Sequence, residues 1–153
     1  MPTVTVTKDN FNDLVEQSNI LILDFWAEWC GPCKNFAPVF EAAAEKHHDV
    51  VFGKIDTESE QELAGIFQIR SIPTLMAFKE SIGIFRQAGA LPPPAFEDLI
   101  SQIKEVDMDV VRQQIEEAKA KMEAGEEEED GRGPEDRRHE QERREDEAVL
   151  GRH

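Results

Sequence analysis

The chain has little positive charge. Its 153 residues include 17 lysines and arginines against 33 aspartates and glutamates, which gives a formal net charge of −16 at pH 7. A protein that binds nucleic acid or an anionic membrane surface through a basic patch needs clustered cations to neutralise phosphates. The composition therefore argues against both kinds of partner.

The chain also lacks a long hydrophobic run. Its longest strongly apolar piece, Ile20–Trp26, is interrupted by Asp24. It is much shorter than the roughly 18–20 apolar residues of a membrane-spanning helix. The first residues, MPTVTVTKDNF, have neither the basic start nor the apolar core of a secretory signal. We therefore expect a soluble, cytoplasmic protein.

Cysteine is scarce as well, since Cys30 and Cys33 are the only two in the chain. Two thiols do not make a disulfide scaffold, and a bond across two intervening residues would constrain the unfolded chain little. A zinc site needs about four ligands, and the nearest histidines, His47 and His48, fall at the far end of the helix expected after the cysteines. These exclusions favour a working redox pair over a structural staple or a metal site.

What the chain does contain is the hydrophobic pattern of an α/β domain. Apolar runs predict strands at 3–6, 20–27, 49–56, 73–79 and 82–87, and helical spacing predicts helices at 10–17, 30–47, 59–67 and 91–103. Ser59 and Glu62 have the spacing of a capping box for the third helix. Early strands that alternate with helices favour parallel pairing, and the last two strands favour an antiparallel hairpin.

The composition divides the chain into three parts. We predict a domain over residues 1–106, an amphipathic helical extension over 107–124 and a disordered charged tail over 125–153. The tail has too few apolar residues to offset its chain entropy. The extension carries an apolar stripe of Val111, Ile115, Ala118 and Met122. Such a stripe favours docking on the domain or self-association, although a partner helix or a marginal helix in solvent remain alternatives.

The position of the two cysteines indicates their chemistry. If Cys30 begins a helix, free backbone N–H groups and the helix dipole stabilise its thiolate, the form that attacks disulfides. Cys33 lies one turn further on, close enough to attack a mixed disulfide formed at Cys30. Pro32 stiffens the turn between them.

Asp24 is the second informative residue. A carboxylate within the apolar run ILILDFWA is costly to bury, which predicts a buried acid with a raised pKa, able to accept the proton of Cys33. Lys54 on the next strand is its candidate charge partner. The alternatives are an Asp24 that faces solvent or caps a neighbour, and an ordinary solvated Lys54.

At these residues the chain resembles the thioredoxin family. DFWAEWCGPCKNFAP, residues 24–38, is similar to the active-site motif of the family. RSIPTL, residues 70–75, matches its second landmark, a proline that follows a cis peptide bond. The segment FKESIGIFRQAGAL keeps the family's spacing from that proline to a Gly-Ala loop. The resemblance covers about residues 2–105 and implies a thioredoxin fold, a central mixed β-sheet flanked by helices.

The resemblance also implies a protein-disulfide reductase and the role of each site residue. Cys30 would be the nucleophile, Cys33 the resolving thiol, Asp24 the buried acid and base, and Lys54 the lysine near that aspartate. The implied substrate-binding surface consists of Trp29, Gly31, Pro32, Ile72, Pro73, Gly89 and Ala90. No cofactor is implied beyond the redox-active Cys30–Cys33 disulfide. The implied partners are disulfide-containing proteins and an NADPH-dependent thioredoxin reductase.

Two departures from the family pattern keep alternatives open. Glu80–Ser81 stands where the family often has an Asn-Gly turn, so we expect a different hairpin turn, and the segment from residue 106 onward lies outside the family core. One alternative is an oxidase or isomerase, although those relatives commonly carry a histidine between the cysteines. Another is a binding or chaperone module whose working part is 107–153.

Overall fold

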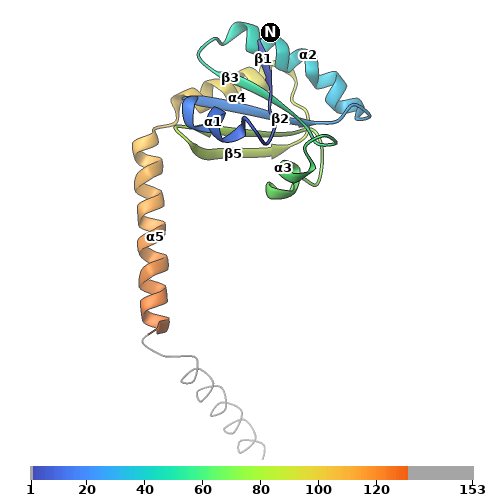
Figure 1. The fold of residues 1–153 in the computed structure, drawn as a ribbon. Coiled ribbons are helices and arrows are strands. Elements are labelled where there is room, and N and C mark those ends of the chain that lie inside the picture. Colours follow the sequence, from blue (N-terminus) through green and yellow to red (C-terminus); the bar gives the residue numbers. More distant parts are fainter. Residues whose placement is uncertain (1, 131–153) are drawn as a thin grey trace, which may run out of the picture. The chain divides into compact units, whose positions relative to one another are not determined.

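The computed structural model describes residues 2–130 (Figure 1). Its strands are β1 (Thr3–Thr5), β2 (Ile20–Trp26), β3 (Val51–Asp56), β4 (Thr74–Lys79) and β5 (Ile82–Ala88). Its helices are α1 (Phe11–Gln17), α2 (Gly31–Lys46), α3 (Gln61–Ile66), α4 (Pro93–Glu105) and α5 (Met108–Asp130). The predicted order of strands and helices and the α/β class are confirmed.

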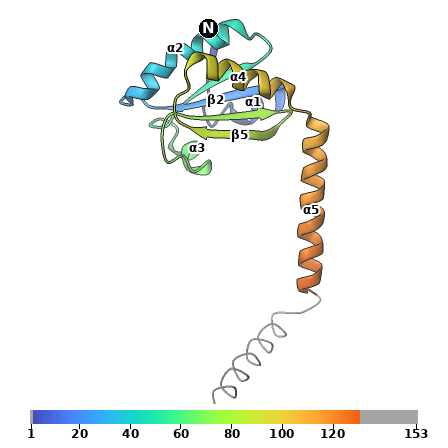
Figure 2. The same ribbon diagram turned by 180° about the vertical axis from the view of Figure 1, so that it is seen from behind.

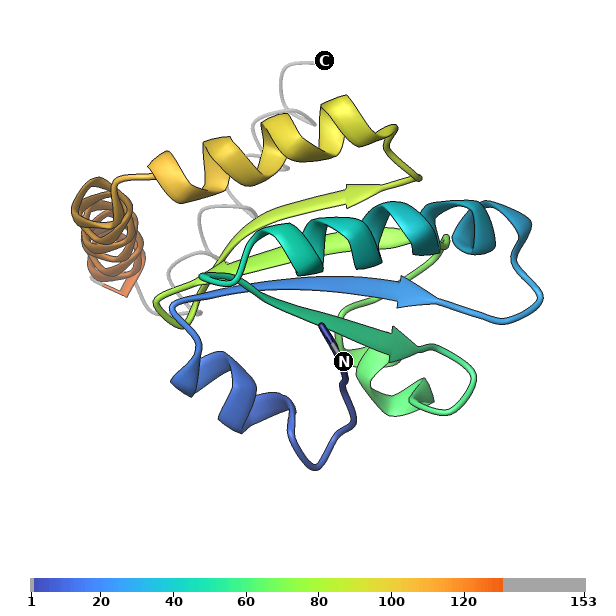
Figure 3. The ribbon, with the colours of Figure 1, turned by 90° about the horizontal axis from the view of Figure 1, so that it is seen from above.

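One mixed sheet organises the nine elements from β1 to α4, with the strand order β1-β3-β2-β4-β5. β1 and β2 run parallel to β3, whereas β4 is antiparallel to both β2 and β5. β5 therefore forms one edge of the sheet (Figure 2). Seen from above, α2 and α4 cover one face, and α1 and α3 lie on the other (Figure 3).

β2 is buried on both faces because its side chains enter two hydrophobic clusters. Ile20 and Ile22 point toward α2 and α4, where they join a cluster that contains Phe36, Phe40 and Phe96. The alternate residues of β2 join the second cluster, which contains Leu21, Leu23, Phe25 and Leu63. Successive side chains of a strand point to opposite faces, so a continuous apolar run suits this central position.

The start of α3 differs from the predicted capping box. The helix begins at Gln61 with Glu60 as its N-cap, and no side chain caps it. The Ser59 hydroxyl instead donates to Asp56 Oδ2 at 3.2 Å. The capping-box prediction is wrong because the N-cap is Glu60, so Ser59 lies in the turn before the helix and not at its N-cap.

The hairpin turn between β4 and β5 keeps a two-residue form despite its unusual sequence. Glu80 has φ of 50° and Ser81 has φ of 68°. Positive φ at both central residues is the backbone geometry for which Asn-Gly is favoured. The turn thus has the left-handed conformation, built from residues that adopt it less readily.

The chain divides into two compact units after Val106, and α5 belongs to the second. The predicted helix is confirmed, but it continues to Asp130, beyond its predicted end at residue 124. Glutamate is a good helix former, which suits the continuation of the helix past Gly125, and disorder of the charged tail stays a prediction. The rest of the predicted tail, 131–153, lies outside the described residues. Burial of the apolar stripe stays a prediction.

Within residues 2–130, no helix combines the length and the apolar character needed to cross a lipid bilayer.

Candidate active site

The two cysteines lie where β2 gives way to α2. Cys30 is the N-cap of α2, and its Sγ accepts a hydrogen bond of 3.2 Å from the backbone N–H of Cys33. The two form a disulfide, with 5.2 Å between their Cα atoms. The N-terminus of a helix favours negative charge, and an N–H already aimed at Cys30 Sγ favours the thiolate there. The predicted helix start at Cys30 is confirmed.

The start of β4 and the end of β5 come together beside the disulfide. Cys30 Sγ lies 3.6 Å from the carbonyl oxygen of Ile72, and the Ile72–Pro73 peptide bond is cis. The N–H of Gly89 donates to the carbonyl of Pro73 at 2.7 Å. Gly89 has φ of 104°, a conformation that favours glycine. Segments far apart in the sequence thus meet at the sulfur atoms.

The residues of the predicted substrate-binding surface differ in exposure. Trp29, Gly31, Pro32, Gly89 and Ala90 are exposed. Ile72 is half-buried and Pro73 is buried. Both cysteines are nearly covered, since Cys30 is 4% and Cys33 is 2% exposed. A disulfide that reaches Cys30 must therefore come into close contact with the exposed residues around it.

Trp29 is the most prominent of these residues, with 70% of its surface exposed. Its indole Nε1–H donates to Glu58 Oε1 at 2.7 Å. A large apolar ring held in one orientation in contact with solvent is typical of a binding surface.

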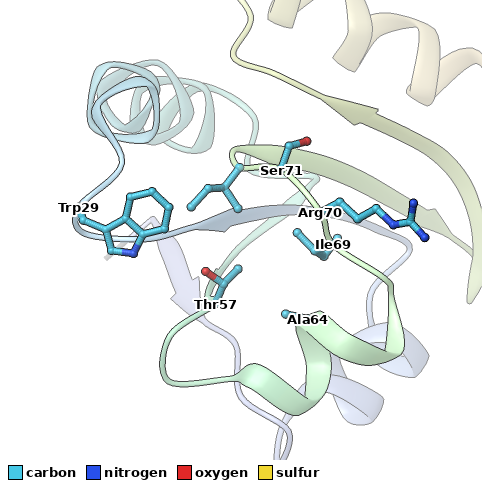
Figure 4. A pocket seen from close by; sticks show the side chains of 7 residues that line it. Trp29, Thr57, Ala64, Ile69, Arg70 and Ser71 are labelled. Carbon is cyan, nitrogen blue, oxygen red and sulfur yellow. The ribbon is translucent and has the colours of Figure 1, made fainter.

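A hollow beside Trp29 contains residues that the sequence did not single out. Its lining consists of Trp29, Thr57, Ala64, Ile69, Arg70, Ser71 and Ile72. Figure 4 shows Trp29 on one side and Ala64 and Ile69 on the other, with the Arg70 guanidinium directed away from Trp29. Thr57 directly follows β3, and the rule that sites gather at the carboxyl ends of strands could have indicated it.

Asp24 is buried on the face of the sheet that α2 covers, at 1% exposure. Neither of its carboxyl oxygens has a hydrogen-bond partner among the described residues. Burial raises the pKa of Asp24 from 3.8 to about 7, and the positive charge of Lys54 partly opposes that rise. Asp24 thus changes its protonation state near neutral pH, and the alternative of a solvent-facing Asp24 is wrong.

Lys54 is the register partner of Asp24 on the neighbouring parallel strand β3. Its Nζ lies 3.8 Å from Glu41 Oε1 and 5.0 Å from the centre of the Trp26 ring. The lysine side chain is only 22% exposed. It is therefore a fixed charge near Asp24 and not an ordinary solvated lysine.

In the part of the chain that the structure describes, no group of three His, Cys, Asp or Glu side chains could hold a metal ion. The group that this site offers for redox chemistry is the Cys30–Cys33 disulfide itself.

Comparison with known proteins agrees with this arrangement. The family model named Thioredoxin matches residues 2–105. The chain is 52% identical over 118 residues to putative thioredoxin 2 of Streptomyces coelicolor, an alignment that covers 77% of this chain and 88% of that protein. It is 42% identical over 90 residues to a thioredoxin of Mycobacterium tuberculosis, covering 58% of this chain and 78% of the relative.

Solved structures show the same fold. A mutant thioredoxin from Halobacterium salinarum superposes with a TM-score of 0.64 at 31% identity, over 69% of this chain and 93% of that one. The oxidised mitochondrial thioredoxin 3 of Saccharomyces cerevisiae gives a TM-score of 0.61 at 31% identity, over 65% of this chain and 94% of that one.

Proposed function

The chain belongs to the thioredoxin family and is a thiol–disulfide oxidoreductase, and we propose that Cys30, Cys33, Asp24 and Lys54 carry out its reaction. The observation that supports this most directly is the position of Cys30. It caps α2, its sulfur accepts the N–H of Cys33, and the two sulfurs are joined in one disulfide. This is the oxidised end state of a reaction that reduces other disulfides.

The reaction begins with both cysteines reduced. The Cys30 thiolate attacks one sulfur of the substrate disulfide, the substrate S–S bond breaks, and its other sulfur leaves as a thiolate that takes up a proton. A mixed disulfide now joins Cys30 to the substrate. The helix N-terminus and the Cys33 N–H stabilise the thiolate form of Cys30 for this step.

The second step closes the Cys30–Cys33 bond. Asp24 accepts the proton of Cys33, and the resulting thiolate attacks Cys30 Sγ, which breaks the mixed disulfide and releases the second substrate sulfur as a thiolate that takes up a proton from water. Two electrons and two protons have then passed to the substrate. An acceptor whose pKa is about 7 suits proton transfer near neutral pH.

The substrate would lie over Trp29, Gly31, Pro32, Ile72, Pro73, Gly89 and Ala90. The convergence of α2, β4 and β5 at Cys30 supports this surface, because it surrounds a sulfur that is only 4% exposed. The substrates would be disulfide-containing proteins, and an NADPH-dependent thioredoxin reductase would restore the two thiols. The cytoplasm suits this cycle, because its thiols are kept reduced.

Trapping the mixed disulfide tests the assigned roles. The Cys30→Ser variant should lose more than about 1000-fold of its turnover on a protein disulfide, since the attacking thiolate is gone. The Cys33→Ser variant should accumulate a covalent adduct with the substrate, detectable by mass spectrometry under non-reducing conditions. An adduct on Cys33 in the Cys30→Ser variant, with turnover retained, would reverse the two roles.

The direction of the reaction is tested by the reduction potential of the Cys30–Cys33 pair. A value near about −270 mV, usual for thioredoxins, supports a reductase, whereas a value near about −120 to −180 mV indicates an oxidase or isomerase. The alternative of a binding or chaperone module has no support from the relatives compared above, which are all thioredoxins.

A further inference from the structure

We propose that Glu41 is a positioning residue, which sets how strongly the Lys54 ammonium acts on the Asp24 carboxyl by holding that ammonium in an ion pair. The inference deepens the proposed function in one respect, because it concerns the group assigned there as the proton acceptor. It begins from the neighbours of Lys54.

Lys54 lies between two carboxylates on the same side of the sheet. Asp24 and Lys54 are register partners on parallel strands, so their side chains leave the sheet on one face. α2 covers this face and carries Glu41, whose Oε1 lies 3.8 Å from Lys54 Nζ. The ion pair that the lysine makes is therefore with Glu41, although Asp24 is its register partner.

Glu41 is itself anchored. The Thr3 hydroxyl, on β1, donates a hydrogen bond of 2.9 Å to Glu41 Oε1, the same oxygen that faces Lys54. The Trp26 ring limits the lysine from another side, with 5.0 Å between Nζ and the ring centre. These contacts give the ammonium a defined position instead of a range of solvated ones.

The charged groups around Asp24 are few enough to identify its influences. β3 contributes Lys54, whereas the register partner of Asp24 on β4 is Leu75, which does not titrate. The charge that acts on Asp24 is that of Lys54, and Glu41 on α2 is the ion-pair partner of Lys54. Since no described residue hydrogen-bonds to either Asp24 oxygen, Lys54 acts on the carboxyl through space, and its effect depends on the separation of the two charges.

Removing the charge of Glu41 should therefore change the pKa of Asp24. In a Glu41→Gln variant the ammonium has lost its partner on α2, and the carboxyl on that face whose ionisation Lys54 already favours is Asp24. The ammonium should relax toward it, which favours the ionised form of Asp24 and lowers its pKa. For any two unit charges about 5 to 6 Å apart at an effective dielectric constant of about 20, an approach of about 1 Å corresponds to a change of about 0.4 pH units.

The test is an NMR titration of the Asp24 side-chain carboxyl carbon in the full-length oxidised protein. We expect a titration midpoint about 0.4 pH units lower in Glu41→Gln than in the wild type. The matched control is Glu45→Gln, the same change one turn further along α2 at an exposed position, and it should leave the midpoint unchanged. An unchanged or higher midpoint in Glu41→Gln overturns the proposal.

A second pair of variants separates an action through Lys54 from the direct effect of a lost charge. Lys54→Met should raise the Asp24 midpoint, and adding Glu41→Gln to Lys54→Met should then change nothing further. An equal shift in both backgrounds would mean that Glu41 acts on Asp24 directly, which also overturns the proposal.

The pH dependence of the second reaction step distinguishes this failure from a failure of the proposed function. If Asp24 accepts the proton of Cys33, the pH profile for release of substrate from the mixed disulfide should move down with the NMR midpoint in Glu41→Gln. A midpoint that moves while the pH profile stays fixed would support Glu41 as a positioning residue and contradict the role of Asp24.

Discussion

Two buried charged residues in the sheet, Asp24 and Lys79, are held in opposite ways. Lys79 is 8% exposed, and its Nζ donates to the carbonyl oxygens of Ile103 at 3.0 Å, Lys104 at 2.8 Å and Val106 at 2.9 Å. Asp24 is 1% exposed, and neither of its oxygens has a hydrogen-bond partner among the described residues. The fold therefore supplies Lys79 with three hydrogen-bond acceptors for its charge. Asp24 has no such partners, and whether it carries a charge depends on its protonation state.

The difference separates a structural role from a chemical one. The last carbonyl groups of a helix have no partners within it and carry its negative dipole end. Lys79 at the end of β4 supplies three N–H donors to the end of α4, so the cation and the helix end stabilise each other. Asp24 has no such donors, so burial favours its neutral form and brings its pKa to about 7. A buried charge without partners is the one that can exchange protons.

Removing the unsatisfied charge should have the largest effect on stability. The native pKa of Asp24 is about 7, against 3.8 for the ordinary carboxyl. Between these two values the unfolded chain has released the proton and the native chain keeps it, so stability falls as pH rises. At pH 8 this lowers the free energy of unfolding by about 4 kcal/mol. Asp24→Asn, which cannot ionise, should be more stable than the wild type at pH 8 by about that amount.

The measurement is urea unfolding of the wild type and Asp24→Asn across the pH range. The gain should be nearly absent at about pH 3, where little of Asp24 is ionised in either state, and should grow up to about pH 7. Other titrating groups contribute equally to both proteins, so the difference between the curves isolates Asp24. A gain that does not depend on pH would show that Asp24 carries no burial cost from its charge.

Removing the satisfied charge should have the opposite sign. Lys79→Met leaves the carbonyls of Ile103, Lys104 and Val106 without this donor in a mostly buried position, which should lower the free energy of unfolding by about 3 kcal/mol. The loss should be similar at pH 5 and pH 8, and turnover per folded molecule should persist. Lys46→Met is the control, because that side chain is 67% exposed and its loss should cost less than about 0.5 kcal/mol. An equal loss in both variants would contradict the contrast between the two buried charges.

The sequence could predict one of these buried charges and not the other. Asp24 stands inside ILILDFWA, an apolar run whose burial follows from its own composition. Lys79 ends PTLMAFK, where a lysine at a strand end normally reaches solvent. Its burial depends on the end of α4, about 25 residues further along the chain, and local pattern carries no information about that contact.

The candidate site likewise has features that the sequence could predict and features that it could not. The position of the cysteines at the start of α2 and the order of strands and helices along the chain follow from motifs and local periodicity, and the structure confirms them. The hollow beside Trp29 includes Thr57 and Ala64, and Lys54 pairs with Glu41 instead of with Asp24 alone. These features depend on how β3, α2 and α3 come together in space. The Ser59 capping box failed for a related reason, since the turn that follows β3 places the N-cap of α3 at Glu60.

The smallest expected effect comes from removing the cation nearest to the unsatisfied carboxyl. Lys54 opposes the rise in the pKa of Asp24, so in Lys54→Met the native chain should keep the Asp24 proton to a still higher pH. Ionising Asp24 then costs more, and the stability loss caused by Lys54→Met should be about 1 kcal/mol larger at pH 8 than at pH 6. Loss of the contacts with Glu41 and Trp26 adds an amount that varies little between these pH values, so the difference between the two losses reports Asp24. The same comparison in the Asp24→Asn background, by urea unfolding, should show no such difference. If the stability loss still differs between the two pH values in that background, Lys54 acts through some titrating group other than Asp24. The contrast between a satisfied and an unsatisfied buried charge would then no longer explain the pH dependence.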